Sequence, residues 1–275
     1  QGKVSGLNIR NNTATPGAYD HTINIRGFGG PLYVIDGITR DGTDFNKLNP
    51  EDIESITVLK DASAAIYGIN AGNGVLIVTT KAGSQHGQAR FQFNANFGLS
   101  TPTDRVRMAN AYEYYWLRNA ANINAGDPEY ISREELEAWR TGEDTFGQDG
   151  DIIHHQSTDW YDATFKNFSV RQEYSLSADG GTKDIQYYFN VNYSNDNGLL
   201  KSGDINYDKW SFRSVVTAKL AKDLKLSANV SGYMDDRWDP AADMFNVFRG
   251  AITSLPYKPV YATYDIEPYN NWPYY

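Results

Sequence analysis

The sequence predicts an α+β domain over residues 1–84, followed over residues 85–275 by the first antiparallel strands, about five, of an incomplete transmembrane β-barrel. The main observation is a change near residue 88 to strict alternation of apolar and polar residues, the period of a strand with two different faces. Short and long connections alternate between these strands. The third observation is the 14% of aromatic residues, with 20 Tyr and 6 Trp, which suit membrane interfaces or sugar-binding surfaces.

The first part of the chain combines short apolar runs with helix signals. Asp36-Gly37 is a strong turn pair. Asn49-Pro50 has the pattern of a helix N-cap followed by proline at the first helical position. An Ala-rich helix is expected over residues 62–67 after Asp61, with Gly68 ending it. Four strands are expected in one small mixed sheet, near residues 23–26, 32–36, 56–60 and 75–80.

The five later strands are expected to sort their side chains between two environments. In a transmembrane barrel the apolar face of each strand points to lipid and the polar face points inward. A soluble β-rich protein also alternates its strands, so alternation alone leaves that fold open. The residues expected to face lipid are Phe91, Phe93, Phe97, Ile185, Phe189, Phe212, Val216 and Leu226. Those expected to face inward are Asn94, Asn96, Asn190, Arg213 and Lys225.

The connections between the strands favour the barrel. Tight turns are expected at residues 179–183 and 221–223, whereas long loops are expected over residues 101–168, 195–207 and 235–275. In outer-membrane barrels the short turns are periplasmic and the long loops are extracellular. Helices are expected within the first long loop at residues 109–121 and 132–140, the second with a capping box formed by Ser132 and Glu135.

Composition excludes several classes of function. The net charge of −9 argues against nucleic acid, because phosphate binding needs a basic face. The sequence contains no Cys, so disulfide scaffolds and thiolate metal sites are excluded. No run of 18 or more apolar residues is present, which excludes a membrane-spanning helix but leaves spanning strands possible.

No residue pattern in the sequence demands catalysis, a metal or a cofactor. The Gly-rich turn at residues 26–30 lacks the spacing of a phosphate-binding loop. The pair His154-His155 has Asp149, Asp151 and Asp159 nearby, but adjacent side chains in an extended chain point in opposite directions. We therefore expect no enzyme, no metal and no cofactor.

Six motifs resemble the plug of SusC/RagA-type TonB-dependent transporters. The segment from Leu48 to Lys81 is the most specific, because it contains both LNPEDIESI and VLKDASAAIYG. The other motifs are GKVSGL at residues 2–7, IRG at 25–27, PLYVIDG at 31–37 and AGNGV at 71–75. The later half resembles the family more loosely, through Asp159-Trp160 and Gly180-Gly181.

The resemblance implies uptake of a large nutrient, a glycan or an oligopeptide, across the outer membrane of a Gram-negative bacterium. It implies a SusD-like surface lipoprotein and TonB as partners, with outer-membrane lipid around the barrel. A siderophore or cobalamin receptor is the alternative within transport; a non-transport β-rich binding protein or a structural subunit of an outer-membrane assembly is the alternative outside it. Family barrels have on the order of 22 strands, so the resemblance also implies a fragment.

The resemblance also selects candidate functional residues. The motif positions of the plug are Arg26, Gly27, Tyr33, Asp36, Gly37, Lys60, Asp61, Ala62, Tyr67, Gly68 and Gly74. Outward-facing plug loops are expected to bind substrate through Arg26, Arg40, Asp41, Asp44 and Tyr67. A plug that moves at each turnover should meet the barrel wall through polar contacts, since separating an apolar interface costs roughly 25 cal/mol per Å². Arg26, Glu54, Lys60 and Asp61 are the residues expected to make them.

Overall fold

The computed structural model describes residues 7–13, 15–18, 21–25, 27, 29–85, 87–147, 150 and 152–260. It divides into two compact units, which are described separately. The first contains residues Gln1–Ser100, Ser169–Gly198 and Ile205–Asp239. The second contains Thr101–Phe168, Leu199–Asp204 and Pro240–Tyr275.

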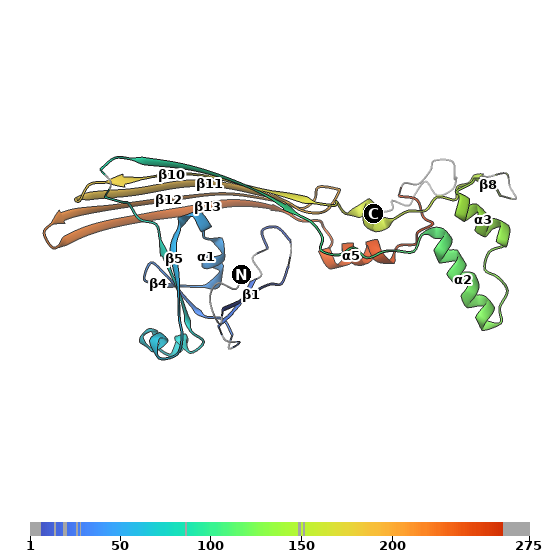
Figure 1. Ribbon diagram of the computed structural model, residues 1–275, viewed down its shortest axis with the longest axis horizontal. Helices are drawn as coiled ribbons and strands as arrows, with labels where there is room; N and C mark the ends of the chain where they lie inside the picture. The colour runs from blue at the N-terminus through green and yellow to red at the C-terminus, as the bar shows by residue number, and fades with distance from the viewer. Residues whose placement is uncertain are drawn as a thin grey trace. The chain divides into compact units, whose positions relative to one another are not determined.

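A small mixed sheet forms the centre of the N-terminal part, in the order β4-β3-β6-β5 (Figure 1). Its strands are β3 (Leu32–Ile35), β4 (Ile38–Arg40), β5 (Ile53–Leu59) and β6 (Val75–Thr80). β3 and β6 are parallel, whereas the other two pairs are antiparallel. Val34 and Val75 are buried in a small core with Ala64 and Ala71.

The predicted strand near residues 23–26 was wrongly assigned to this sheet. It forms β2 (His21–Ile25), which pairs along its whole length with β1 (Leu7–Asn11) in a separate hairpin. The fourth place in the mixed sheet belongs to β4. Asp36 and Gly37 both have positive φ, 49° and 81°, which is the two-residue turn that folds a strand directly back beside its predecessor.

Short helices connect these strands. α1 (Gly42–Lys47) begins within residues 39–44, where a plug loop was expected, and Asp41 caps it by accepting a hydrogen bond from the Asp44 amide. The predicted Asn49 cap is confirmed at the start of η1 (Pro50–Asp52). The predicted Ala-rich helix is a 3₁₀ helix, η2 (Asp61–Tyr67), ended by Gly68, and η3 (Ile69–Ala71) follows it.

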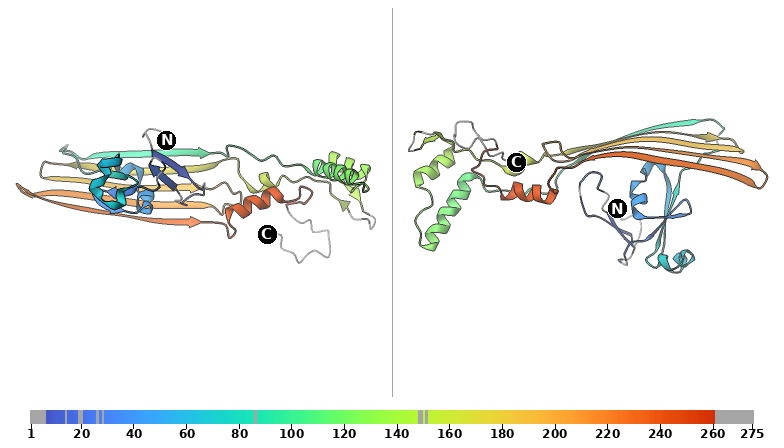
Figure 2. Two further views of the ribbon diagram at one scale, coloured as in Figure 1. Left: turned by 90° about the horizontal axis from the view of Figure 1, so that it is seen from below. Right: turned by 180° about the vertical axis from the view of Figure 1, so that it is seen from behind.

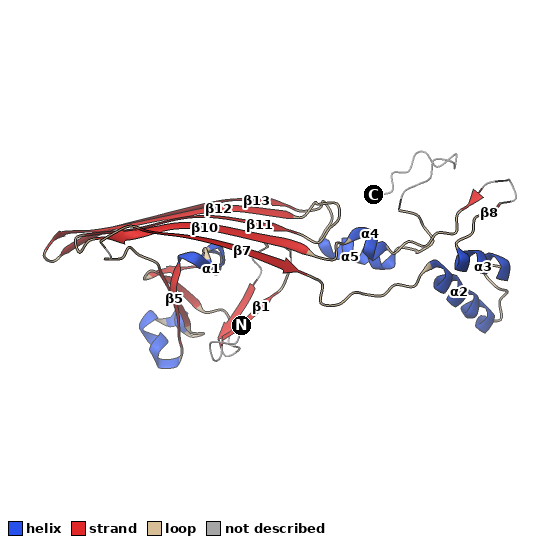
Figure 3. Ribbon diagram, turned by 45° about the horizontal axis from the view of Figure 1, so that its top comes forward, coloured by secondary structure: helices blue, strands red, loops and turns tan. Residues whose placement is uncertain are grey.

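Five long antiparallel strands form the second sheet, as predicted, in the order β13-β12-β11-β10-β7 (Figure 3). We call this sheet the strand wall. Its two outer strands, β7 and β13, each pair with one neighbour, so the wall is open and is not a closed barrel. The strands are β7 (Arg90–Ser100), β10 (Ser169–Gly181), β11 (Ile185–Asn197), β12 (Asn206–Ala221) and β13 (Leu224–Trp238).

The two faces of the strand wall differ as the alternation predicted. The mixed sheet lies against one face (Figure 2), and Asn190 and Arg213 on that face are 2% and 4% exposed. On the opposite face Phe91 and Phe97 are 74% and 68% exposed. The aromatic row is therefore not packed in a core. Val216 on that face is only half-buried, and the inward-facing Asn96 and Lys225 are exposed.

The second unit is built from helices and a short hairpin. Its elements are α2 (Ala111–Ala125), α3 (Arg133–Thr141), β8 (Thr145–Phe146), β9 (Ile152–Ile153), α4 (Trp160–Thr164) and α5 (Met244–Thr253). Both predicted loop helices are present. Ser132 caps α3 by accepting from the Glu135 amide, whereas the complete reciprocal capping box belongs to Asn110 and Glu113 at α2.

Among the helices described here, none is long and apolar enough to cross a membrane.

Candidate functional site

The mixed sheet contacts the strand wall through one polar interface, which we call the polar seat. On the sheet side it comes from the β3–β4 turn, the end of α1, η1 and the end of β6. On the wall side it comes from every strand except β10. The seat consists of Asp36, Lys47, Glu51, Asp52 and Thr80 against Asn94, Tyr188, Asn190, Lys209, Arg213, Asn229 and Tyr233.

Asp36 is the centre of the seat. The tight turn projects its carboxylate so that one oxygen accepts from the Thr80 amide at 2.8 Å and the other from the Thr80 hydroxyl at 2.6 Å. The second oxygen also accepts from Arg213 Nη2 at 2.9 Å. Arg213 donates to the Thr80 hydroxyl as well, and Asn229 approaches the carboxylate at 3.5 Å. An ion pair thus joins the sheet to the middle of β12.

The environment of Asp36 favours its charged form. Partial burial would by itself raise the pKa of the carboxyl, but the hydrogen bonds from Thr80 and the nearby Arg213 guanidinium outweigh it and lower the pKa below the ordinary 3.8. The contribution of this carboxylate to stability is therefore complete above pH 3.8 and is lost as the pH falls through the lowered pKa.

This linkage gives a testable acid response. We expect resistance of the N-terminal part to protease to decrease below pH 3.8 in the parent protein, with a component that Asp36→Asn lacks, since the amide does not titrate. The comparison is proteolysis of both proteins across the same pH series. Identical acid profiles would contradict a stabilising role for the ionised carboxylate.

A second contact lies at η1, where Asp52 is buried. Its Oδ1 accepts from the Tyr188 hydroxyl at 3.0 Å and from Asn190 Nδ2 at 2.6 Å. The Ser175 hydroxyl donates to Asn190 Oδ1 at 2.9 Å. Next to it, Asn94 Nδ2 donates to Glu51 at 3.0 Å. The 3₁₀ turn, fixed by its Asn49 cap, positions both acids toward β7 and β11.

A third contact joins two lysines and one tyrosine. Lys47, at the end of α1, donates to the Tyr233 hydroxyl at 2.7 Å, and its ammonium lies 4.6 Å from the centre of that ring. Lys209 donates to the Lys47 carbonyl at 2.6 Å, and its ammonium lies 5.5 Å from the same ring. A tyrosine face attracts cations, so Tyr233 holds both ammonium groups close together.

The described contacts of the seat are polar, as predicted, and come from residues other than Arg26, Glu54, Lys60 and Asp61, whose pairing with the wall stays a prediction. Arg26 lies outside the described residues, as does the side chain of Asp61. Glu54 is exposed on β5. Lys60 precedes η2, where its carbonyl accepts from Ser63. The hydrogen bonds of the seat involve charged groups, and such bonds contribute about 1.5–3 kcal/mol each.

The predicted substrate-binding residues fall into two groups. Arg40 and Asp44 form an exposed ion pair at 3.8 Å where β4 leads into α1. Asp41 lies between them and caps α1. Tyr67 ends η2 and is half-buried against the core around Val75. No contact between the two groups is recorded among the described side chains. Their role in binding therefore stays a prediction.

The remaining motif residues have structural positions. Tyr33 stacks on Phe45 at 5.3 Å, and burial raises the pKa of its hydroxyl. Gly27 and Gly68 have positive φ with open space around them. Gly74 also has positive φ, 95°, and a Cβ there would lie 2.8 Å from Ile25 Cδ1. The motif of residues 71–75 is thus required by close packing between the hairpin and the mixed sheet. The side chain of Ala62 lies outside the described residues.

Sequence reasoning placed Arg213 inward but did not pair it with Asp36. Tyr188 is not among the inward residues named from the sequence, yet its hydroxyl is a member of the seat. The available signal was an arginine in the middle of a strand whose neighbouring inward positions are Ser211 and Val215. A charge at such depth needs a partner, but the sequence does not say which acid supplies it.

No metal centre is found in the part of the chain that the structure describes, where no cluster of three or more potential ligands occurs. His154 pairs with Asp144 at 3.0 Å. His155 is buried with its ring against Trp139. Asp159 caps α4, and Asp149 and Asp151 lie outside the described residues.

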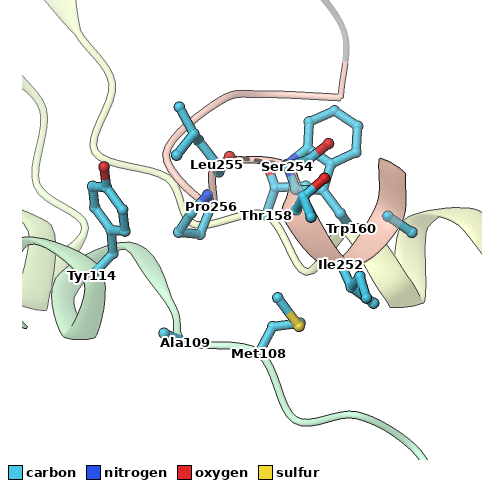
Figure 4. Close-up of a pocket in the computed structure, with 11 residues that line it drawn as sticks. Met108, Ala109, Tyr114, Thr158, Trp160, Ile252, Ser254, Leu255 and Pro256 are labelled. Atoms are coloured by element: carbon cyan, nitrogen blue, oxygen red, sulfur yellow. Dashed lines mark hydrogen bonds between the residues drawn. The ribbon is translucent and has the colours of Figure 1, made fainter. Parts of the chain in front are cut away.

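The second unit contains a small apolar pocket of about 170 Å³ (Figure 4). Trp160 closes one side, and its indole donates to the Leu255 carbonyl at 3.0 Å. Met108 and Tyr114 line other parts of it. No charged side chain lines the pocket.

Comparison with known proteins identifies the family of this chain. Residues 1–75 match the family described as TonB-dependent Receptor Plug Domain. The TonB-dependent receptor SusC of Bacteroides thetaiotaomicron is 31% identical, over 96% of this chain and 25% of that protein. The solved RagAB peptide transporter matches with a TM-score of 0.74 and 25% identity, over 94% of this chain and 31% of that chain. The chain belongs to the SusC/RagA-type TonB-dependent receptors.

Within this family the mixed sheet and hairpin are the plug, and the strand wall is part of the barrel. TonB-dependent receptor P26 of Formosa agariphila is similar too, 30% identical over 95% of this chain and 25% of that protein. The RagAB peptide importer in its 'open-open' state matches with a TM-score of 0.71 and 26% identity, over 88% of this chain and 28% of that chain. The chain thus spans about a quarter of the length of the curated relatives. These relatives are receptors and transporters, not enzymes.

Proposed function

We propose that this receptor takes up a large nutrient, a glycan or an oligopeptide, across the outer membrane with energy delivered by TonB. The polar seat is the observation that carries this proposal. It joins the plug to the wall through hydrogen bonds and the Asp36–Arg213 ion pair, which water can replace as the plug moves. A plug meant only to block the barrel would need no such exchangeable interface.

The proposed partners are TonB on the periplasmic side and a SusD-like lipoprotein at the cell surface. Membership of the SusC/RagA type supports both. The similar RagAB protein is a peptide transporter, which supports the peptide alternative. The specific plug motif between Leu48 and Lys81 favours this type over siderophore or cobalamin receptors. Arg26, Arg40, Asp41, Asp44 and Tyr67 are proposed to contact the substrate.

Surrounding lipid is proposed from a row of rings on the outer face of the wall. Phe97, Tyr174, Tyr193 and Trp210 are neighbours across four strands, with successive centroid separations of 5.7, 6.4 and 4.7 Å. The hydroxyls of the two tyrosines bond Gln172 and Asp208 on the long-loop side. From Trp210 to Leu220 a strand spans roughly 34 Å, or roughly 25 Å at a tilt near 40°, the height of an apolar band in a bilayer.

The position of this row can be measured with single cysteines, because the chain has none of its own. We expect Val216→Cys to resist a water-soluble maleimide in intact membranes and Asp208→Cys to react, since the residues lie on the same face on opposite sides of Trp210. Both should react after the membrane is dissolved and the protein denatured. Equal reaction in intact membranes would contradict a lipid boundary at the aromatic row.

The proposed uptake is tested by growing cells that carry the full-length receptor on peptides or glycans, with TonB present or deleted. Accumulation that requires both the receptor and TonB is expected. Affinity purification of the receptor should recover a surface lipoprotein. Equal accumulation without TonB would overturn the proposed energy source, and accumulation of iron chelates alone would favour the siderophore alternative.

A further inference from the structure

The inner face of the strand wall changes character along its length. Next to the plug, its inward positions are mainly amides and hydroxyls, for example Ser175, Asn192 and Ser211 in one cross-strand row. Toward the long loops, the next two rows are charged. Those rows carry three cations and three anions: Arg171, Glu173, Asp196, Lys209, Asp235 and Arg237. We call these six residues the charged rim.

Charges of opposite sign alternate across the rim. Arg171 is opposite Asp196 on the neighbouring strand, and Lys209 is opposite Asp235. Arg171 also bonds Glu173 at 2.6 Å along its own strand. The side chains of Arg171 and Arg237 are 56% and 39% exposed, so these two cations of the rim are accessible to a ligand. Lys209 is 6% exposed and is held in the seat by the Lys47 carbonyl.

Among the described residues, the inner face of the strand wall presents no aromatic ring that is free of contacts with the plug. Gly17 of the plug lies against the ring of Tyr207, so close that a Cβ at position 17 would overlap the ring. Tyr233 carries the Lys47 ammonium. Tyr233 is 47% exposed, whereas the other exposed rings of the strands, such as Phe91, Phe97 and Phe212, lie on the opposite face. The aromatic content of the strands therefore does not supply a sugar-stacking surface inside the wall.

We propose that the charged rim contacts the substrate and selects chains that carry both ammonium and carboxylate groups, which are oligopeptides. This inference rests on the proposed uptake function and names its substrate class. A peptide meets both signs of charge with charge-assisted hydrogen bonds, which are stronger than neutral ones. A neutral glycan must desolvate the charged groups without replacing their counter-charges. A sulfated glycan can pair with the cations of the rim, but it leaves the three carboxylates without a counter-charge and is repelled by them.

The test uses the full-length receptor and three defined probes: a mixture of zwitterionic oligopeptides, maltooligosaccharides and sulfated oligosaccharides. We expect the parent to bind the peptides most tightly, and less tightly as salt rises. The triple variant Glu173→Gln, Asp196→Asn, Asp235→Asn should lose about tenfold in peptide affinity, equivalent to about 1.4 kcal/mol. Lys219→Gln with Lys225→Gln removes two inward charges at the other end of the strands and should leave affinity unchanged.

A charge exchange separates recognition from folding. Arg171→Glu with Glu173→Arg keeps both signs on β10 and should keep the preference for peptides. Tighter binding of either oligosaccharide mixture by the parent would overturn the proposal, as would a triple variant that binds peptides as well as the parent. Failure of TonB-dependent uptake for every probe would instead refute the proposed function, because equilibrium binding reports on the rim without transport.

Discussion

Replacing Arg213 with methionine is expected to loosen the plug and to admit large antibiotics into the cell. The substitution keeps the length of the side chain but leaves the Asp36 carboxylate without its cation at the centre of the seat. Breaking a buried pair in this way costs 3–5 kcal/mol. Asp36 is 29% exposed, so solvent screens the pair and the expected cost of the substitution is about 2 kcal/mol. A loss of that size raises the fraction of receptors with an unseated plug roughly thirtyfold. The measurement is the survival of cells on vancomycin, which should decrease as the antibiotic enters through the loosened plug.

Two control variants identify the ion pair as the cause. Lys219→Met removes a cation from the same strand and the same face, away from the seat, and should leave permeability unchanged. The double variant Asp36→Asn with Arg213→Met removes both charges, so its leak should be smaller than the sum of the single effects. Additive effects would show that Asp36 and Arg213 act independently, contrary to the 2.9 Å contact.

Replacing Gly74 with valine is expected to destabilise the plug strongly. The residue has φ of 95°, and its Cβ would lie 2.8 Å from Ile25 Cδ1 and 3.0 Å from the Leu59 carbonyl. The left-handed backbone costs about 1–2 kcal/mol for a residue with a side chain, and overpacking adds about 1–3 kcal/mol. A loss of about 4 kcal/mol removes much of the stability of a small domain. Receptor yield in the outer membrane and protease resistance of the plug measure it.

Gly37 supplies the matched control for backbone strain. Its φ is 81°, and no atom lies within 4 Å of a Cβ built on it. Gly37→Ala therefore carries the backbone cost without the clash and should reduce protease resistance far less than Gly74→Val. Similar losses in both variants would show that backbone strain, and not the contact of the hairpin with the mixed sheet, explains the requirement for glycine at position 74.

Local patterns predicted most of the elements. The alternation of residues 91–99, 185–193, 210–220 and 224–230 identified long strands, and Asn49-Pro50 and Ser132 identified helix starts that the structure confirms. The errors occurred where pairing depends on distant residues. The strand at residues 21–25 contains no information about whether β1 or β3 is its neighbour, and α1 occupies a stretch, Gly42–Lys47, whose apolar content is too small to show helical periodicity.

The sequence by itself determined the two-part organisation, the two-faced strands and the family motifs, because each depends on residues close together in the chain. Only the tertiary structure decided which residues join the parts. Asp36 and Arg213 are 177 positions apart, and Asp52 and Asn190 are 138 apart. Side-chain period places each of them on a face, but electrostatic pairing depends on distance in space. That distance is set only when the mixed sheet lies against the strand wall.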